Sequence, residues 1–117
     1  MGTWDVTAVT DFGGLLRDLT NFNEDLAGWG TSSVTRMNAM FREAYEFDQP
    51  LAFDTGSVTS MFGMFWQADD FGWSQTSTSL NFDTSSVTSM ASMFRGPIGG
   101  TVFNQPLDFD TSRVTDM

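Results

Sequence analysis

One short motif recurs along the whole chain and limits the folds that it can adopt. The pattern Asp-Thr-Ser-x-Val-Thr-x-Met is recognisable in five copies, which begin at Trp4, Trp29, Phe53, Phe82 and Phe109. The valines of these copies serve as markers, and they are spaced 25, 24, 29 and 27 residues apart. Self-similarity of this period indicates a tandem-repeat protein, in which each unit is covered by its neighbours. We therefore predict one repeat domain over residues 1–117, with units 4–28, 29–52, 53–81, 82–108 and a partial unit 109–117.

Apolar residues recur at fixed offsets from each marker valine. The residues three, six and seven positions after the marker are apolar in each of the first four units, as in Met37, Met40 and Phe41. Together with the valine, these offsets follow the 3.6-residue period of one helical face. The Thr-Ser pair before the valine supplies oxygens suited to an N-cap. The first half of each unit is therefore predicted to be a short helix or a single 3₁₀ turn, beginning near Ser33, Ser57 and Ser86.

The second half of each unit has a different pattern. Residues 47–51 read Phe-Asp-Gln-Pro-Leu, and residues 22–26 and 103–107 follow the same plan. Large apolar residues separated by polar ones, with a proline that cannot donate a backbone hydrogen bond, are typical of a short strand with limited pairing. Stacked units would place these strands side by side as a parallel sheet. The methionine and aromatic columns are interpreted as the core of a solenoid.

Composition excludes several classes of function. The chain has no His, no Cys and a formal charge of −10, with all five of its positive charges on arginine. It therefore lacks an imidazole base, a thiol nucleophile and the usual ligands of structural zinc. An acidic chain is repelled by nucleic acid and by anionic lipid, and no apolar stretch approaches the roughly 20 residues that cross a bilayer. We expect neither nucleic acid nor membrane insertion, and we expect no signal peptide or anchor within the chain.

The aspartates offer two readings. Asp5, Asp54, Asp83 and Asp110 share one column, which could bind Ca²⁺ between units or cap Asx turns. Glycine at position 30 interrupts the column and no known calcium-loop spacing is present, so turn capping is favoured and no cofactor is predicted. An acid–base enzyme would need a locally distinct carboxylate pair, and only Asp69 and Asp70 fall outside the repeat pattern. We predict that the chain is not an enzyme.

The third unit departs from the others on a polar column. Arg17, Arg42 and Arg95 occupy one offset, where the third unit has Trp66, and acidic residues follow the first two arginines. Trp66, Phe71 and Trp73 lie beside an insertion at 74–79, with a second insertion at 96–101. Inserted segments and exposed aromatic residues are typical of binding faces. These three residues are the predicted ligand-binding residues; the alternative for Phe71 is a core position equivalent to Phe22 and Phe47.

The motif Phe-Asn-Gln-Pro-Leu-x-Phe-Asp-Thr-Ser-x-Val-Thr-x-Met, intact at 103–117, and Val-Thr-Ser-Met-x-x-Met-Phe at Val58 and Val87 resemble a known family. This is the bacterial surface protein repeat of about two dozen residues, a domain of unknown function related to BspA-like leucine-rich repeats. The resemblance implies a right-handed, leucine-rich-repeat-like solenoid of short parallel strands and helical turns, here of four full coils plus a half coil. It also implies an extracellular or cell-surface location, and it supplies no catalytic residues.

The expected function is a non-enzymatic adhesion or interaction module that binds a protein or glycan ligand at a cell surface. Neither end carries a polar capping unit, so the chain is either part of a larger surface protein or associates head to tail with copies of itself. The alternative function is thus a filament or matrix subunit built by end-to-end stacking. A threonine column, which includes Thr35 and Thr59, is a remote candidate for an ice- or crystal-binding face, but the unequal unit lengths argue against it.

Overall fold

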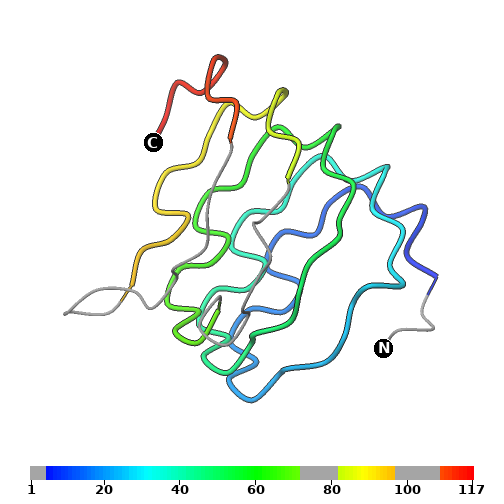
Figure 1. Ribbon diagram of the computed structural model, residues 1–117, viewed down its shortest axis with the longest axis vertical. Helices are drawn as coiled ribbons and strands as arrows, with labels where there is room; N and C mark the ends of the chain where they lie inside the picture. Colours follow the sequence, from blue (N-terminus) through cyan, green and yellow to red (C-terminus); the bar gives the residue numbers. More distant parts are fainter. Residues whose placement is uncertain (1–4, 72–81, 97–108) are drawn as a thin grey trace.

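Successive repeats run side by side in the computed structural model, which describes residues 5–71, 82–96 and 109–117 (Figure 1). Isolated parallel bridges join them at one position, two residues after each marker valine. The bridges are Asp11–Arg36, Arg36–Ser60, Ser60–Ser89 and Ser89–Asp116. Their spacing along the chain equals that of the marker valines, so neighbouring repeats pair in register.

The fold class expected from the sequence is wrong. Within the described residues the chain forms no helix and no strand longer than a single bridged residue, and turns connect the bridges. A leucine-rich-repeat-like solenoid needs short parallel strands and helical turns, and the described residues contain neither a sheet nor a helix. Neither the short helix nor the 3₁₀ helical turn expected to begin near Ser33, Ser57 and Ser86 forms, and hydrogen-bonded turns take their place.

Left-handed backbone at regular intervals explains why no helix forms. In the second repeat Ala39 has a φ of 54° and Glu43 a φ of 59°. The equivalent residues of other repeats behave alike: Gly14, Asp18, Gly63, Gln67 and Ser92. A right-handed helix cannot pass through such residues, whereas a type II turn requires a positive φ at its third position. The apolar period of the sequence therefore comes from a series of turns and not from a helical face.

Backbone hydrogen bonds in these turns alternate between two directions. The N–H groups of Met37, Ala39 and Phe41 donate to carbonyl oxygens of the following repeat at 2.8–3.0 Å. Between them, the N–H groups of Met40 and Arg42 donate to residues three positions earlier, at 3.4 and 3.2 Å. An α-helix would send all of these donors four residues back along the chain. Three of these five donors instead join neighbouring repeats, so each turn depends on the repeat beside it.

The strands expected in the second half of each repeat are also absent where the structure describes it. Residues 47–51 form no bridge, and Pro50 removes one donor from this segment. A side chain links the repeats here, because the Asp48 N–H donates to Asn23 Oδ1 at 2.9 Å. The third segment, 103–107, lies outside the described residues.

The core follows the apolar columns. Val34, Met37, Met40 and Phe41 are fully buried, as are their counterparts Val58, Met61 and Met64. Phenylalanine rings of consecutive repeats stack with centroids 5.5–5.9 Å apart, in the rows Phe22–Phe47–Phe71 and Phe41–Phe65–Phe94. The prediction that these columns form the core is confirmed. An exception lies in the first repeat, where Leu15 is 45% exposed.

The threonine three residues before the marker valine is buried in the second, third and fourth repeats, and it does not cap a helix. The hydroxyl of Thr55 donates to the carbonyl oxygen of Asp83 in the next repeat at 3.0 Å, and Thr31 and Thr84 make equivalent bonds. The predicted N-cap role is wrong, because no helix follows and the hydroxyl instead satisfies a backbone acceptor of the neighbouring repeat.

Candidate functional site

Trp66 lies between two arginines of the neighbouring repeats. The guanidinium carbon of Arg42, in the repeat before, is 4.5 Å from the centroid of the Trp66 ring, and that of Arg95, in the repeat after, is 4.7 Å away. Both distances are well within the roughly 6 Å range of a cation–π interaction. The column predicted to hold three arginines and one tryptophan therefore becomes a physical stack. We refer to Arg42, Trp66 and Arg95 as the Arg–Trp stack.

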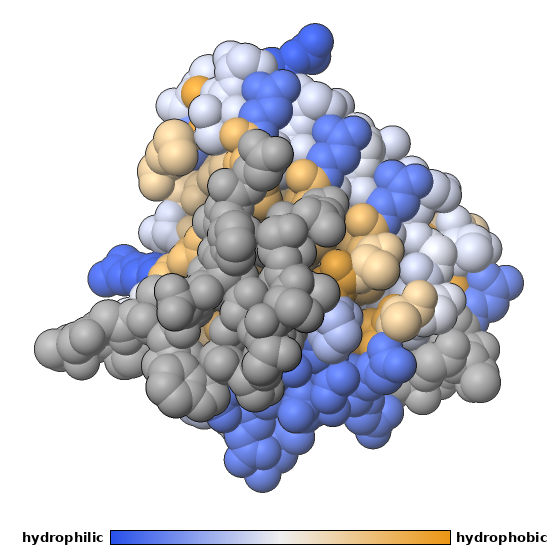
Figure 2. Space-filling model, in the orientation of Figure 1, coloured by the Kyte–Doolittle hydropathy of each residue, from blue (hydrophilic) through white to orange (hydrophobic). Residues whose placement is uncertain are grey.

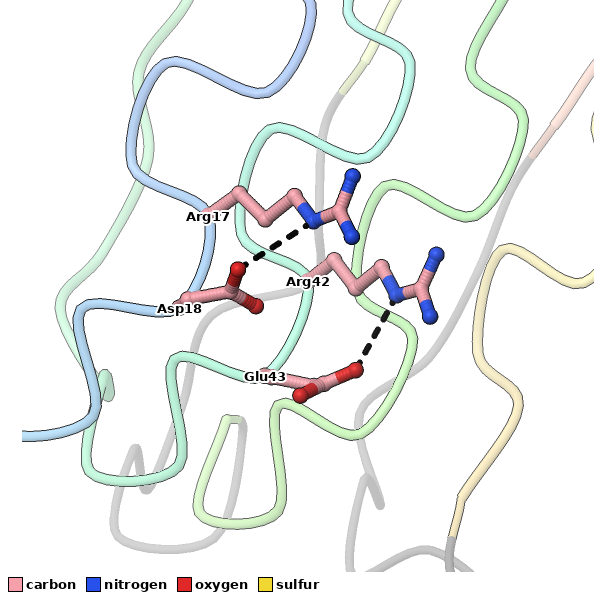
Figure 3. Close-up of polar contacts among 4 residues, drawn as sticks. All are labelled: Arg17, Asp18, Arg42 and Glu43. Atoms are coloured by element: carbon pink, nitrogen blue, oxygen red, sulfur yellow. Dashed lines mark hydrogen bonds and ion pairs between the residues drawn. The ribbon is translucent and has the colours of Figure 1, made fainter.

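Acidic residues accompany two arginines of this column. Arg17 Nε lies 3.4 Å from Asp18 Oδ2, and Arg42 Nε donates to Glu43 Oε1 at 3.1 Å. Figure 3 shows the two arginine side chains extending side by side in the same direction. The Arg42–Glu43 pair is the more shielded, with both side chains 29% exposed. Such local pairs contribute little stability, but they orient the guanidinium groups.

Phe62 is a surface residue of the same site that the sequence reasoning missed. It is 40% exposed, and its ring meets Trp66 edge to face with centroids 6.5 Å apart. The equivalent positions of other repeats hold Gly13, Asn38 and Ala91. A single aromatic residue in a column of small and polar residues was the signal that could have identified it.

The three predicted ligand-binding residues have different outcomes. Trp66 is half-buried in the Arg–Trp stack. Phe71 is 3% exposed and stacks on Phe47 and Phe65, so it occupies the core position that was its alternative and offers no surface to a ligand. Trp73 and the insertion at 74–79 lie outside the described residues, as do residues 97–101 of the second insertion.

The aspartate column caps turns. Asp5, Asp54, Asp83 and Asp110 each accept a hydrogen bond at 2.9–3.1 Å from the backbone N–H two residues later, which confirms the predicted Asx turns. Hydroxyl and backbone donors lower the pKa of Asp5, Asp83 and Asp110 below the usual value for aspartate. The described residues contain no group of three or more acidic residues placed to hold a metal ion.

Asp69 and Asp70 are the acidic pair outside the repeat pattern. Desolvation, and then the neighbouring charge of Asp70, raise the pKa of Asp69. Within the described part of the chain, Oδ1 of Asp69 is buried without a hydrogen-bond partner. The Asp70 N–H donates to the carbonyl oxygen of Tyr45 at 3.0 Å, which anchors this segment to the preceding repeat.

Hydrophobic residues also reach the surface elsewhere. The face drawn in Figure 2 is hydrophilic along its lower edge, with hydrophobic residues exposed above it. An open recess of about 300 Å³ is lined mainly by apolar side chains, contributed by Met90, Ser92, Met93, Phe94, Phe109 and Met117.

These features describe a protein of tandem turn-forming repeats stacked in register, with a cationic and aromatic surface at its third repeat. The family described as Mycoplasma protein of unknown function, DUF285, matches residues 1–97 and 76–117, and the chain belongs to this family. No curated protein and no solved structure matches it. In the part of the chain that the structure describes, no helix is long and apolar enough to cross a membrane.

Proposed function

We propose that this protein is a non-enzymatic interaction module, extracellular or at a cell surface, that binds a protein or glycan ligand. The observation that carries the proposal is the Arg–Trp stack with Phe62 beside it. Core columns hold similar residue types from repeat to repeat, whereas aromatic residues enter these two surface columns only in the third repeat. A distinct aromatic and cationic surface on a repetitive framework is typical of binding sites.

The proposal includes that the protein is not an enzyme. Acid–base chemistry needs two carboxyl groups whose environments separate their pKa values. The regularly placed aspartates are instead engaged in Asx turns that repeat along the chain, with the same role at each position. Loss of a measured turnover in Asp69→Ala would be required to favour an enzyme.

The extracellular or cell-surface location and the relation to BspA-like repeats are also part of this proposal. The motif at 103–117 resembles the repeats of BspA-like bacterial surface proteins, which act outside the cell. The family that matches the chain is one of unknown function, so this kinship is supported by the motif alone.

An array of glycans and surface proteins, probed with the whole labelled chain, tests the proposal. We expect saturable binding to at least one ligand that is lost in Trp66→Ala and retained in Tyr45→Ala. Tyr45 is the control because it is an aromatic residue outside the site whose side chain is 37% exposed. No saturable binding, or equal loss in both variants, would contradict the proposal.

The alternative is a structural subunit that associates with copies of itself. The apolar recess lined by Met90, Met93 and Phe109 supports it, because exposed apolar surface of this kind promotes association. Light-scattering mass measured over a concentration series separates the two functions. A mass that stays near 13.0 kDa at all concentrations would contradict self-assembly, whereas a mass that rises with concentration would favour it.

A further inference from the structure

We propose that the Arg–Trp stack, with Phe62 at its edge, binds the carboxylate-bearing sugars of an acidic polysaccharide. This inference rests on the proposed function and narrows its ligand class. It follows from the placement of positive charge, from the geometry of the stack and from the hydrogen bonds that already occupy the backbone around it.

Positive charge is scarce in this chain and is concentrated in one column. The chain has five arginines and no lysine, and three of the five are Arg17, Arg42 and Arg95. Arg95 is exposed, and within the described residues no ion pair joins it to a carboxylate. Arg17 and Arg42 are paired with Asp18 and Glu43, so the charge of this column that no ion pair among the described residues offsets is that of Arg95. The net charge of −10 opposes a polyanion at long range, so a carboxylate must be recognised by local contacts at the stack.

The stack leaves guanidinium donors available. Arg42 and Arg95 hold their guanidinium carbons 4.5 and 4.7 Å from the centroid of the Trp66 ring, and a cation–π contact of this kind does not consume the N–H donors of a guanidinium. Arg42 uses its Nε for Glu43, which leaves its terminal nitrogens for another acceptor. Guanidinium edges match the geometry of a carboxylate, and the bonds that they form are charge-assisted.

The backbone around the stack is not available to a peptide that binds by strand addition. The Trp66 N–H donates to the backbone carbonyl oxygen of Gly63 at 3.1 Å, and the Gln67 N–H donates to that of Arg95 at 2.7 Å. The Trp66 carbonyl oxygen accepts from the backbone N–H of Glu43 at 2.8 Å. A peptide that binds by adding a strand needs free backbone groups, and these are occupied. Recognition at this surface must therefore use side chains.

Phe62 completes the match to a carboxylated sugar. Its ring is 40% exposed and meets the same Trp66 ring that the two guanidinium groups contact. A uronic acid presents apolar C–H groups and a carboxylate on one rigid ring, so it can contact an aromatic side chain and a guanidinium together. An isolated inorganic anion would use only the arginines.

The test is calorimetric titration of the whole chain with alginate oligosaccharides, which are polymers of uronic acids. We expect Arg95→Gln to weaken binding at least about tenfold, as for the loss of a hydrogen bond between charged groups. Arg36→Gln is the matched control, because it removes the same charge from an exposed arginine outside the stack. We expect it to change affinity less than about twofold.

Trp66 is assigned a positioning role, which a second pair of variants tests. Trp66→Ala should weaken binding as strongly as Arg95→Gln, and Trp66→Phe should restore part of the affinity because phenylalanine retains a cation–π face. Melting curves of each variant report folding separately. In the unaltered chain, NMR should show the Trp66 indole N–H among the signals that shift with alginate.

Each contrary outcome is distinct. Equal weakening by Arg95→Gln and Arg36→Gln would show that binding depends only on net charge. That result would overturn the proposal that the Arg–Trp stack is the binding site. Polyglutamate binding as tightly as alginate would make the ligand an acidic peptide and overturn it as well. Absence of alginate binding, with another Trp66-dependent ligand found on the array, would overturn this inference alone. Absence of any such ligand would overturn the proposed function too.

Discussion

Hydroxyl groups that donate hydrogen bonds to aspartates lower the pKa of those carboxyl groups. The side chain of Ser85 donates to Asp83 Oδ1 at 2.6 Å and its backbone N–H donates at 3.0 Å, and the side-chain bond is the larger cause of the lowered pKa of Asp83. A carboxyl whose pKa is lower in the folded than in the unfolded state adds stability at pH values above its unfolded pKa. That contribution is lost as pH falls through the folded pKa.

Ser85→Ala should therefore raise the pKa of Asp83 toward its ordinary value of 3.8. The backbone bond remains, so the Asx turn itself should persist. NMR titration of the Asp83 carboxyl carbon measures the change directly, and the variant should lose less stability than the unaltered chain as pH falls below about 4. An unchanged titration curve would show that the hydroxyl does not control this carboxyl.

Buried threonine hydroxyls contribute at the same scale. Thr55 is fully buried and its hydroxyl bonds the Asp83 carbonyl, whereas Thr59 is exposed and bonds the Thr35 carbonyl at 3.2 Å. Thr55→Val should reduce the free energy of unfolding by about 1 kcal/mol, because the acceptor is left in a part-buried site. Thr59→Val should change it by less than about 0.5 kcal/mol, since water replaces an exposed bond. Denaturant unfolding compares the two, and equal losses would contradict the role of burial.

The elements of this fold are the turns that link the bridges. Substitutions at the left-handed residues of these turns should have the largest effect on stability. Gly63 has a φ of 58°, and a Cβ added there would lie 3.4 Å from Trp66 Cε3. Non-glycine residues do occupy equivalent positions, as Ala39 does, at the expense of backbone strain. Glycine at position 63 therefore relieves strain in the repeat that carries the Arg–Trp stack.

Gly63→Ala should destabilise the protein by about 1 to 2 kcal/mol, the usual penalty of a left-handed backbone for an L-residue. Gly56→Ala is the control, because Gly56 is not left-handed and its added Cβ would make only ordinary contacts at 3.5 Å. Thermal melts of both variants should show a lower melting temperature for Gly63→Ala alone. A matching decrease in Gly56→Ala would indicate that the loss of glycine itself, and not its φ, is responsible.

Ring stacking connects the repeats at the scale of the whole molecule. Phe65 contacts rings of three neighbours, with centroids 5.5 Å from Phe41, 4.1 Å from Phe71 and 5.5 Å from Phe94. Since the two rows of rings meet at this residue, its removal should weaken the packing of the second, third and fourth repeats together.

Phe65→Ala should reduce the free energy of unfolding by about 3 to 5 kcal/mol, the usual range for a buried phenylalanine. Phe62→Ala removes the same ring from an exposed position of the same repeat and should have a small effect. Hydrogen exchange checks the spread of the damage, since protection should fall in the repeats on both sides of Phe65. Loss confined to the third repeat would argue that the repeats unfold independently.

The repeat register, the core columns and the Asx turns were accessible from the sequence. Each depends on residue type at a fixed offset, and residues such as Met37, Met61 and Asp83 carry the same information in every copy. Periodicity also placed Phe71 in the column of Phe47, and the structure puts it at this alternative core position and not at a ligand-binding surface.

The path of the backbone was decided by tertiary structure. An apolar spacing of three and four residues fits both a helix and a row of turns, and the choice depends on whether N–H groups such as those of Ala39 and Phe41 bond within the repeat or to the next one. The contact of Arg42 and Arg95 with Trp66 likewise exists only because the repeats stack. The sequence determined which residues recur, whereas packing between repeats decided their conformation, because the hydrogen bonds that select it join different copies.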